Sequence, residues 1–471
     1  MAIETDLLIL GGGTGGYVAA IRAAQQGMKV VLVEKDKLGG TCLHRGCIPT
    51  KAYLRSAEVM DTLRDAESYG IDLKEKGEVN YGKVVSRKNE IVDTLHQGVK
   101  GLISKNKITY LKGKGAVLGP SIFSPVSGAV AVTFDDPDRE EEIYVPKKLI
   151  IATGAVPNSL PTLPVDEEVI LSSNGMFQLE ALPDSMAIIG GGVIGVEWAS
   201  MLNSLGVKVT VIEALDRLVI NESEAVSKEL YRQFIKRGIN IELNQPVKKA
   251  EMKNGKVLLS LEEAEEVLTV DKVLTAIGRR PVVDGLGLQN TSVKYTEKGI
   301  VVNSHYQTSE SHIYAIGDCI DTMQLAHVAM KEGELAVEHI VKNTSEPLAY
   351  HNVPRCTYTS PEIASVGYIR ETVPEGRRVK IGTFSFGSNG KALINGNAEG
   401  LVEIIRDETS DDLLGVSVIG PHATELISEV STAIYMDASP IELGEAIHPH
   451  PTLSEAIQEA ALDTYKSAIH K

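Results

Sequence analysis

The chain has 471 residues, of which 43% are hydrophobic and 23% charged, so it is long enough for roughly two to four domains, each with its own core. A net charge of -16 argues against a nucleic-acid partner, and no run of about eighteen uncharged apolar residues predicts a membrane span. Four cysteines are too few for a secreted disulfide scaffold, and the first strand-like run begins by Asp6 and leaves no room for a signal peptide, so we expect a cytoplasmic protein.

The first 35 residues predict a dinucleotide-binding unit. Residues 5–35 have the pattern of a strand, a glycine turn, a helix and a second strand. Gly11, Gly13 and Gly16 follow the spacing GxGxxG, and Glu34 closes the second strand. Glycines let backbone amides approach a pyrophosphate, and the carboxylate accepts hydrogen bonds from a ribose. GxGxxG alone is a weak signal, but between a strand and a helix and with a terminal acid it is a strong one.

Residues 39–51, GGTCLHRGCIPTK, place Cys42 and Cys47 five positions apart directly behind this unit. A free thiol is mostly protonated at neutral pH, so a catalytic role requires something that favours the thiolate. The basic residues His44 and Arg45 and a helix start near Cys47 would both do so. We therefore predict a reactive disulfide here.

Two other roles for this cysteine pair stay open on the residues alone. The pair could bind a metal, or it could be two ordinary buried thiols. Zinc normally needs four closely spaced ligands, and the remaining cysteines, Cys319 and Cys356, are solitary. Taken by itself the pair leaves a redox role and a structural role about equally open.

The next part of the chain predicts helices followed by strands. Charged and apolar residues alternate at helical spacing over residues 52–105, which favours packing helices. Strands are expected at 108–117 and 129–134, and KLIIATG at 148–154 predicts a strand that runs into a glycine turn. The proline-rich segment 157–164 then predicts a linker into an inserted domain.

The strand, glycine turn, helix and strand occur a second time at residues 185–214. Gly190, Gly192 and Gly195 take the places of the first three glycines, and Glu213 takes the place of the first acid. Chance glycine spacing would not reproduce the strand, the helix length and the acid together. Two matched copies therefore predict two bound dinucleotides.

Glu213 also indicates which dinucleotide the second copy prefers. A carboxylate at this position would repel a 2′-phosphate, so the site is expected to take NAD(H) over NADP(H). Arg217, four residues further on, is the one feature that could weaken this preference.

The chain is then expected to return to the first domain and to form a final one. Residues 273–281, VLTAIGRRP, repeat the strand-then-glycine pattern of KLIIATG. Residues 311–318, SHIYAIGD, predict a buried strand that ends at an acid, where parallel sheets bind ligands, and residues 324–340 predict a helix. From about Tyr350 the chain mixes helices with strands, as expected of an α+β domain, and the expected strands are 362–366, 380–386, 400–406 and 414–419.

Residues 448–455, HPHPTLSE, predict an acid-base pair. Pro451 is expected at the first position of a helix, which places His450 at the helix start and Glu455 about one turn further along. A histidine oriented by a carboxylate is a usual general acid-base arrangement. The alternative is a histidine that only caps the helix, which is the commoner role for an isolated histidine.

The two glycine motifs, TCLHRGCIPTK, AIGD and HPHPTLSE together resemble the flavoprotein disulfide reductases, and the resemblance covers essentially the whole chain. It implies an α/β fold with two Rossmann-like dinucleotide-binding domains, the second inserted in the first, and a C-terminal α+β dimerisation domain. The expected segments are 1–155 and 277–348 for the FAD-binding domain, 156–276 for the NAD-binding domain and 349–471 for the dimerisation domain.

The same resemblance implies where the cofactors bind. Residues implied for FAD are Gly11, Gly13, Gly16, Glu34, Gly115, Gly154, Asp318 and Ala326. Residues implied for NAD are Gly190, Gly192, Gly195, Glu213 and the backbone near Gly278. Lys51 resembles the family's lysine near the reactive nitrogen of the flavin, where it would pair with Glu197. No metal is expected.

The resemblance also implies the catalytic roles. Cys42 would exchange with the substrate, and Cys47 would lie against the flavin as the charge-transfer thiolate. His450 and Glu455 would be the base and the residue that orients it, and they would reach Cys42 of the other subunit. The active form is therefore expected to be a homodimer.

Within this family the chain is similar to the members that oxidise dihydrolipoamide, and LHRGCIPTK, LGPSIFSP and GVIGVEWASML are similar to bacterial members serving branched-chain 2-oxo acid dehydrogenase complexes. This implies oxidation of protein-bound dihydrolipoamide with reduction of NAD+, with the lipoyl domain and acyltransferase core of such a complex as partners. No nucleic-acid or membrane partner is implied.

Other members of the family fit the residues less well. Glutathione reductases usually carry arginines in place of Glu213, mercuric reductases end in a cysteine pair, and soluble transhydrogenases lack the disulfide. Two alternative functions remain. One is an NADH-dependent reductase of another small disulfide, and the other is a flavin-bearing docking subunit whose redox activity is vestigial.

Overall fold

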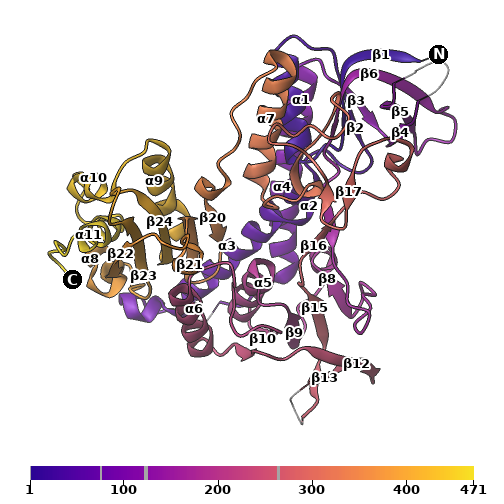
Figure 1. The fold of residues 1–471 in the computed structure, drawn as a ribbon. Helices are drawn as coiled ribbons and strands as arrows, with labels where there is room; N and C mark the ends of the chain where they lie inside the picture. The colour runs from indigo at the N-terminus through magenta and orange to yellow at the C-terminus, as the bar shows by residue number, and fades with distance from the viewer. Residues whose placement is uncertain (1, 75–76, 121–125, 263–265) are drawn as a thin grey trace. The chain divides into compact units, whose positions relative to one another are not determined.

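The structure is a computed structural model that describes residues 2–74, 77–120, 126–262 and 266–471 (Figure 1). These residues form two compact units. The first unit contains the described residues of 2–52, 85–158 and 278–348, and the second contains those of 53–84, 159–277 and 349–471. Residues 121–125, the last five of the sequence LGPSIFSP, lie outside the described residues.

The first unit is built from one large sheet, two small antiparallel pairs and a set of helices. Its elements are β1 (Ile3–Leu10), α1 (Thr14–Gln25), β2 (Val30–Glu34), α2 (Gly40–Arg45), β3 (Thr109–Lys112), β4 (Lys114–Leu118), β5 (Ala129–Thr133), β6 (Glu142–Ile151), β7 (Ala155–Pro157), β16 (Arg279–Pro281), η3 (Leu288–Asn290), β17 (Tyr295–Thr296), β18 (Gly299–Ile300), β19 (Ile313–Ala315), η4 (Gly317–Cys319) and α7 (Ala326–Lys342).

Two long helices have residues in both units. They are α3 (Cys47–Arg64), whose residues from Tyr53 on belong to the second unit, and α4 (Tyr81–Lys105), whose residues from Val85 on belong to the first. Both helices lie within residues 52–105 or overlap them, so the prediction of packing helices there is confirmed.

The large sheet of the first unit has the strand order β3-β2-β1-β6-β5-β4, and β19 pairs with the end of β6. β1 lies parallel to both β2 and β6, with Leu10 opposite Val33 and Ile151. The apolar run of β1 is at most 3% exposed, as expected of a parallel strand covered on both faces. The parallel strands end at the edge where Gly11 follows β1, which is where such sheets bind ligands.

Two helices cover this sheet side by side, α1 and α7 (Figure 1). They approach closely because each has a glycine at the contact. A Cβ added to Gly15 would lie 2.9 Å from the Ala329 carbonyl oxygen, and one added to Gly333 would lie 2.9 Å from the Gly15 carbonyl oxygen. The start of α7 is thereby fixed to the start of α1.

The strand predicted at residues 108–117 is wrong as a single element. The chain turns at Gly113, so that β3 pairs parallel with β2 and β4 pairs antiparallel with β5. Gly113 donates its N–H to the Glu34 carbonyl oxygen at 3.0 Å, and a Cβ at this position would lie 2.6 Å from the Thr133 carbonyl oxygen. A contact between residues far apart in the sequence therefore places the break.

The second unit contains a parallel sheet, a small antiparallel sheet and a larger antiparallel sheet. Its elements before residue 349 are η1 (Ala66–Tyr69), β8 (Ile170–Ser172), η2 (Gly175–Gln178), β9 (Ser185–Ile189), α5 (Val193–Ser204), β10 (Lys208–Ile212), α6 (Glu224–Lys236), β11 (Asn240–Glu242), β12 (Val247–Lys253), β13 (Lys256–Leu261), β14 (Leu268–Val270) and β15 (Lys272–Thr275). The parallel sheet has the order β11-β10-β9-β15-β8, and the small sheet has the order β12-β13-β14.

The C-terminal part of this unit is the expected mixture of strands and helices. Its elements are η5 (Tyr350–Asn352), β20 (Arg355–Thr357), β21 (Glu362–Gly367), η6 (Arg370–Thr372), β22 (Val379–Ser385), η7 (Phe386–Ser388), α8 (Gly390–Ile394), β23 (Leu401–Asp407), β24 (Leu413–Gly420), α9 (Ala423–Tyr435), α10 (Pro440–Glu445) and α11 (Glu455–Asp463). The sheet has the order β20-β21-β24-β23-β22. Its central strand, β24, is buried along its whole length, and Ile427, Val430, Ala456 and Ile457 of α9 and α11 share its core.

Packing does not separate residues 159–277 from residues 349–471, so the predicted division into four domain segments stays a prediction. Over the described ranges, no helix has both the length and the apolar character needed to cross a membrane.

We predict that Gly16→Ala will destabilise the first unit. A Cβ at this position would lie 1.8 Å from the Gly11 carbonyl oxygen, a backbone atom that cannot move aside. Overpacking of this kind costs about 1–3 kcal/mol, so the thermal unfolding midpoint should fall. The matched control is Gly98→Ala in α4, where a Cβ would meet no atom within 4 Å. Alanine should leave that helix unchanged or slightly more stable, and equal midpoints for the two variants would contradict the steric argument.

Candidate active site

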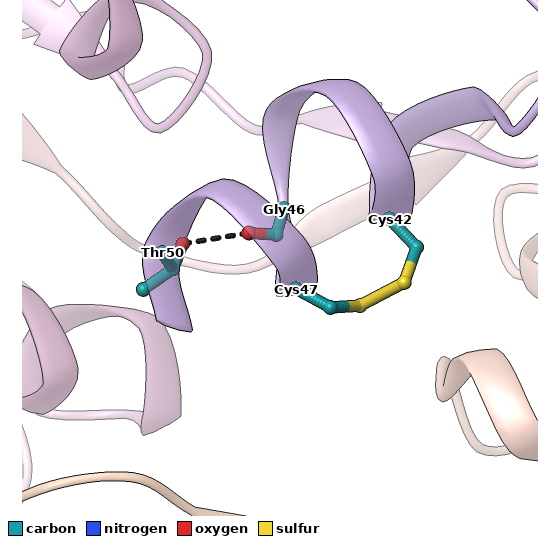
Figure 2. Close-up of a disulfide and its surroundings, with 4 residues drawn as sticks. All are labelled: Cys42, Gly46, Cys47 and Thr50. Atoms are coloured by element: carbon teal, nitrogen blue, oxygen red, sulfur yellow. Dashed lines mark hydrogen bonds between the residues drawn. A yellow bond between two sulfur atoms is a disulfide. The ribbon is translucent and has the colours of Figure 1, made fainter. Parts of the chain in front are cut away.

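Cys42 and Cys47 form a disulfide in this structure (Figure 2). Cys42 lies on the short helix α2, Cys47 is the first residue of α3, and Gly46 joins the two helices. The two Cα atoms are 4.7 Å apart. Thr50, one turn into α3, donates its hydroxyl to the Gly46 carbonyl oxygen at 2.7 Å and so fixes the junction that brings the sulfurs together.

The helix that carries Cys42 is mounted on the first glycine turn. Gly39, the residue before α2, donates its N–H to the Gly12 carbonyl oxygen at 2.8 Å, and Gly13 and Gly39 form a parallel bridge. A Cβ on Gly40 would lie 2.7 Å from the Gly13 Cα. The disulfide and the predicted dinucleotide site are therefore neighbouring parts of one backbone arrangement.

The two basic neighbours of Cys42 each have a partner in the first unit. Burial lowers the pKa of His44, despite the hydrogen bond between its Nε2 and the Leu38 carbonyl oxygen at 2.9 Å, so this ring is mainly neutral at pH 7. Arg45 forms an ion pair with Asp36 that balances its charge. The start of α3 at Cys47 remains as a source of positive potential for a thiolate.

The first glycine turn has the geometry that a dinucleotide requires. Gly11 has φ +107°, which favours glycine, and Gly16 passes too close to its carbonyl oxygen for any side chain. Gly13 differs, because a Cβ there would meet nothing nearer than the Gly40 Cα at 3.9 Å. Packing therefore does not require glycine at position 13, and the bare backbone at the start of α1 is the shape that a pyrophosphate needs.

Glu34 is held at this turn by the backbone. Its Oε2 accepts the N–H of Gly12 at 2.6 Å, and its Oε1 accepts the N–H of Asp36 at 2.7 Å. Each carboxylate oxygen has a second lone pair, so the group can also accept hydroxyl groups of a ribose. The acid is thus oriented before any ligand binds.

The second glycine turn repeats each of these contacts. Gly190 has φ +109°, a Cβ on Gly195 would lie 1.9 Å from the Gly190 carbonyl oxygen, and a Cβ on Gly192 would meet no atom within 4 Å. Glu213 accepts the N–H of Gly191 at 2.5 Å and that of Leu215 at 2.8 Å. The two turns therefore fit two dinucleotides equally well.

The other residues implied for the cofactors differ in whether they border open space or are packed against other residues. Gly154 and Gly278 have φ +71° and +96°, and a Cβ on Gly154 would meet no atom within 4 Å, so it borders open space. Gly115 has a packing reason to be glycine, because a Cβ there would lie 2.4 Å from Leu10 Cδ2. Ala326 is the first residue of α7, and Asp318 lies in η4 and is partly buried.

Two residues near Asp318 were missed by the sequence reasoning. Glu332 is 0% exposed, and its carboxylate accepts the Gly317 N–H at 2.6 Å and the Thr322 hydroxyl at 2.9 Å. Arg279 donates to the Ala155 carbonyl oxygen at 2.6 Å, and its charge opposes the rise that burial causes in the pKa of Asp318. The signal for Glu332 was a carboxylate on the buried face of α7, and for Arg279 it was the position directly after a glycine turn.

Lys51 and Glu197 belong to different units, so their pairing stays a prediction. Lys51 lies on α3 one turn after Cys47, on the same face of the helix. Glu197 is a buried residue of α5, and its Oε1 accepts the N–H of Tyr358 at 2.9 Å.

His450 and Glu455 lie together, but the predicted helix start is wrong. α11 begins at Glu455, so Pro451 precedes the helix. The Glu455 carboxylate instead organises the turn before the helix, since it receives His450 Nδ1 at 2.8 Å and the Thr452 N–H at 2.8 Å. Burial raises the pKa of Glu455, but the hydrogen bonds from Thr452 and His450 outweigh this effect, and the pKa is lowered.

The His450 ring is accessible for chemistry. Its side chain is 78% exposed, whereas that of Glu455 is 25% exposed. Because Nδ1 faces the carboxylate, Nε2 is the nitrogen that can exchange a proton with a substrate. Among the residues that the structure describes, no group of three or more histidine, cysteine or acidic side chains could hold a metal ion.

A second histidine of the same segment forms a separate ion pair, and this pair predicts a pH-dependent stability. The side chain of His448 is 5% exposed, with Nε2 2.7 Å from Glu429 Oε1 and Nδ1 2.9 Å from the Ala446 carbonyl oxygen. The hydrogen bond to Glu429 raises the pKa of His448, although burial acts in the opposite direction. The pair therefore stabilises the fold fully below about pH 6.5, the ordinary histidine value, and this contribution is lost as the pH rises through the raised value.

We predict that Glu429→Gln will destabilise the protein by about 1–2 kcal/mol at pH 6 and by less at pH 9. The measurement is the thermal unfolding midpoint of the variant and the wild type at both pH values. Glu445→Gln, which changes an exposed carboxylate of α10, is the matched control and should show no such pH dependence. A larger destabilisation at pH 9 than at pH 6 would show that the sign is wrong.

Comparisons with known proteins agree with this geometry. Residues 5–333 match the family described as pyridine nucleotide-disulphide oxidoreductase, and residues 353–461 match the dimerisation domain of that family. A dihydrolipoyl dehydrogenase of Bacillus subtilis is 50% identical over 476 residues, which cover 100% of both chains. A dihydrolipoyl dehydrogenase of Thermus scotoductus is 40% identical over 99% of this chain and 98% of that protein.

The crystal structure of LpdA from Mycobacterium tuberculosis is 26% identical and superposes with a TM-score of 0.89 over 97% of this chain and 99% of that one. The predicted fold class is confirmed by these matches. Members of the family use FAD and NAD(H), which confirms the prediction of two dinucleotide cofactors. The two glycine turns match, a disulfide follows the first of them, and the similarity extends over the whole chain. The chain therefore belongs to the pyridine nucleotide-disulphide oxidoreductase family.

Proposed function

We propose that this protein is a dihydrolipoyl dehydrogenase, which oxidises protein-bound dihydrolipoamide to lipoamide and reduces NAD+ as a component of a 2-oxo acid dehydrogenase complex. The observation that carries the proposal is the Cys42–Cys47 disulfide mounted on the first of two dinucleotide turns. A disulfide is the group that can take two electrons from a dithiol by exchange. The similarity to dihydrolipoyl dehydrogenases along the full chain supports the choice of substrate.

Each turn is assigned one cofactor. FAD would be held by Gly11, Gly13, Gly16 and Glu34, with Gly115, Gly154, Asp318 and Ala326 beside it. NAD would be held by Gly190, Gly192, Gly195 and Glu213 and the backbone near Gly278. Lys51, paired with Glu197, would lie near the reactive nitrogen of the flavin. When bound, FAD would supply a two-electron acceptor for the reduced cysteines and a hydride donor for NAD+.

The cysteines carry out the exchange with the substrate. One thiolate of dihydrolipoamide attacks Sγ of Cys42, the bond between Cys42 and Cys47 breaks, and Cys47 leaves as a thiolate. The second substrate thiol then attacks the substrate sulfur of this mixed disulfide, which closes the lipoamide ring and releases Cys42. Two electrons and the substrate's two sulfur-bound protons leave the substrate. The start of α3 favours the negative charge on Cys47.

His450 is the proposed base for this exchange. Its Nε2 would take the proton of the attacking thiol, and Glu455 would hold Nδ1 and stabilise the positive ring that results. We propose that His450 of one subunit acts on Cys42 of a second copy, so that the active protein is a homodimer. The dimerisation domain matched by residues 353–461 supports this assignment.

The further partners would be the lipoyl domain, which brings the dithiol to Cys42, and the acyltransferase core of the complex. We place the reaction in the cytoplasm. In that reducing compartment a disulfide more often takes part in catalysis than in holding the fold together. The other two cysteines, Cys319 and Cys356, are free thiols.

We predict that dihydrolipoamide will reduce the purified, FAD-loaded protein. Anaerobic addition of one equivalent should produce a long-wavelength absorption band that reports contact between a cysteine thiolate and the flavin. Steady-state assays should show NADH formation with dihydrolipoamide and little turnover of glutathione. Negligible NADH formation from dihydrolipoamide together with turnover of another disulfide would overturn the proposal.

We predict that His450→Gln will lower the rate of lipoamide turnover by about 10²- to 10⁴-fold, because a positioned acid-base group contributes that much. Rapid-mixing measurements should assign the loss to reduction of the protein by dihydrolipoamide. His351→Gln, in the same unit and outside the His450 segment, is the matched control and should retain the wild-type rate. An unchanged rate in His450→Gln would return this residue to a capping role.

A further inference from the structure

Arg217 lies in the segment that wraps around the second glycine turn. The carboxylate of Glu213 accepts backbone N–H groups from both Gly191 and Leu215, and the Val219 N–H donates to the Gly191 carbonyl oxygen at 2.9 Å. A Cβ on Gly191 would lie 2.6 Å from Leu218 Cδ2. Arg217 is therefore held between two residues that contact the turn on which the dinucleotide would bind.

The first glycine turn is wrapped by its own segment in the same manner. Leu38 Cδ2 would lie 2.8 Å from a Cβ on Gly12, and Glu34 binds the Gly12 N–H. The residue before that leucine is Lys37, which is exposed. Arg217 is the equivalent residue of the second turn, directly before Leu218. Its side chain is only 21% exposed, so another group in the second unit must contact it.

Glu371 retains Arg217. Its Oε1 lies 3.6 Å from Arg217 Nη1 and also accepts the N–H of Glu224, the first residue of α6, at 2.9 Å. The side chains of Arg217 and Glu371 are 21% and 32% exposed, so solvent weakens the attraction between them less than it would in a fully exposed pair. Arg217 Nη2 makes one further bond, to the Ile220 carbonyl oxygen at 3.1 Å.

A second ion pair fixes the end of the same segment. Arg355 Nε lies 3.5 Å from Glu222 Oε1, and the Glu222 side chain is 5% exposed. Both Glu371 and Arg355 come from residues 353–461, the matched dimerisation domain. This domain therefore holds the segment that follows Glu213 at two points.

We propose that Glu371 reinforces the exclusion of 2′-phosphorylated dinucleotides by Glu213, because it keeps Arg217 away from the 2′ position of the adenosine ribose. The proposal rests on the proposed NAD site at Glu213. A 2′-phosphate brings two negative charges beside the Glu213 carboxylate, and only a nearby cation could offset that repulsion. Arg217 is a cation on the same segment, and its guanidinium suits a phosphate, but Glu371 engages it.

The test measures binding to the FAD-loaded protein with two probes, adenosine 2′,5′-bisphosphate and 5′-ADP. In Glu371→Gln, Arg217 loses its ion pair and keeps the hydrogen bond to the Ile220 carbonyl oxygen, with Glu224 as a further carboxylate that acts on its charge, so the guanidinium becomes more available to the phosphate. The affinity for the bisphosphate should rise about tenfold, the effect of one charge-assisted hydrogen bond, while that for 5′-ADP should change little. The double variant Arg217→Met/Glu371→Gln should return to the wild-type ratio.

Two further variants make the outcome independent of how well Glu371→Gln folds. Arg217→Met alone should leave bisphosphate binding unchanged, because Arg217 is already withheld in the wild type. Glu399→Gln, which removes a surface carboxylate paired with Arg232 and Lys236, is the matched control and should also have no effect.

Several results would overturn the inference. They are an unchanged bisphosphate affinity in Glu371→Gln, a gain that persists in the double variant, or a loss in Arg217→Met alone. Failure of the wild type to bind either 5′-ADP or NAD+ would instead overturn the proposed NAD site, so the two failures can be told apart.

Discussion

At each of the two glycine turns, two backbone segments approach so closely that no side chain fits between them, and the rest of this molecule depends on this contact. Gly16 lies against the Gly11 carbonyl oxygen, and Gly195 lies against that of Gly190, with no room for a Cβ in either place. This contact lets each strand turn sharply into a helix whose first amides are bare. The Gly12 carbonyl oxygen then receives the Gly39 N–H, so the helix with Cys42 is carried by the first turn.

Electrostatics around these turns is governed by charges that already have partners. Arg45 is paired with Asp36, and Arg217 is paired with Glu371, while burial keeps His44 mainly neutral. The positive potential for ligands and thiolates therefore comes mainly from helix starts and backbone N–H groups, which are fixed in place. Such fixed dipoles favour a dinucleotide and a thiolate without rearrangement of side chains.

Carboxylates do much of the positioning in both units. Glu34 and Glu213 orient the residues after their strands, Glu332 orients the loop at Asp318, and Glu455 orients His450. Each accepts a backbone N–H, so the acid shapes the chain as well as its ligand or partner. Removal of such a group would leave a donor unpaired and would disturb function and folding together.

The sequence by itself determined the two dinucleotide folds, the cysteine pair, the positions of the main strands along the chain and the pairing of His450 with Glu455. These features follow from spacing along the chain, because turns, helix faces and close sequence neighbours are set by local backbone geometry. Only the tertiary structure decided the break at Gly113, the start of α11 at Glu455, the lowered pKa of His44 and the hydrogen-bond and ion-pair partners of Glu332 and Glu371. Each of these depends on burial or on a partner distant in the sequence, and a pattern of neighbouring residues carries no information about which distant group will lie within hydrogen-bond distance.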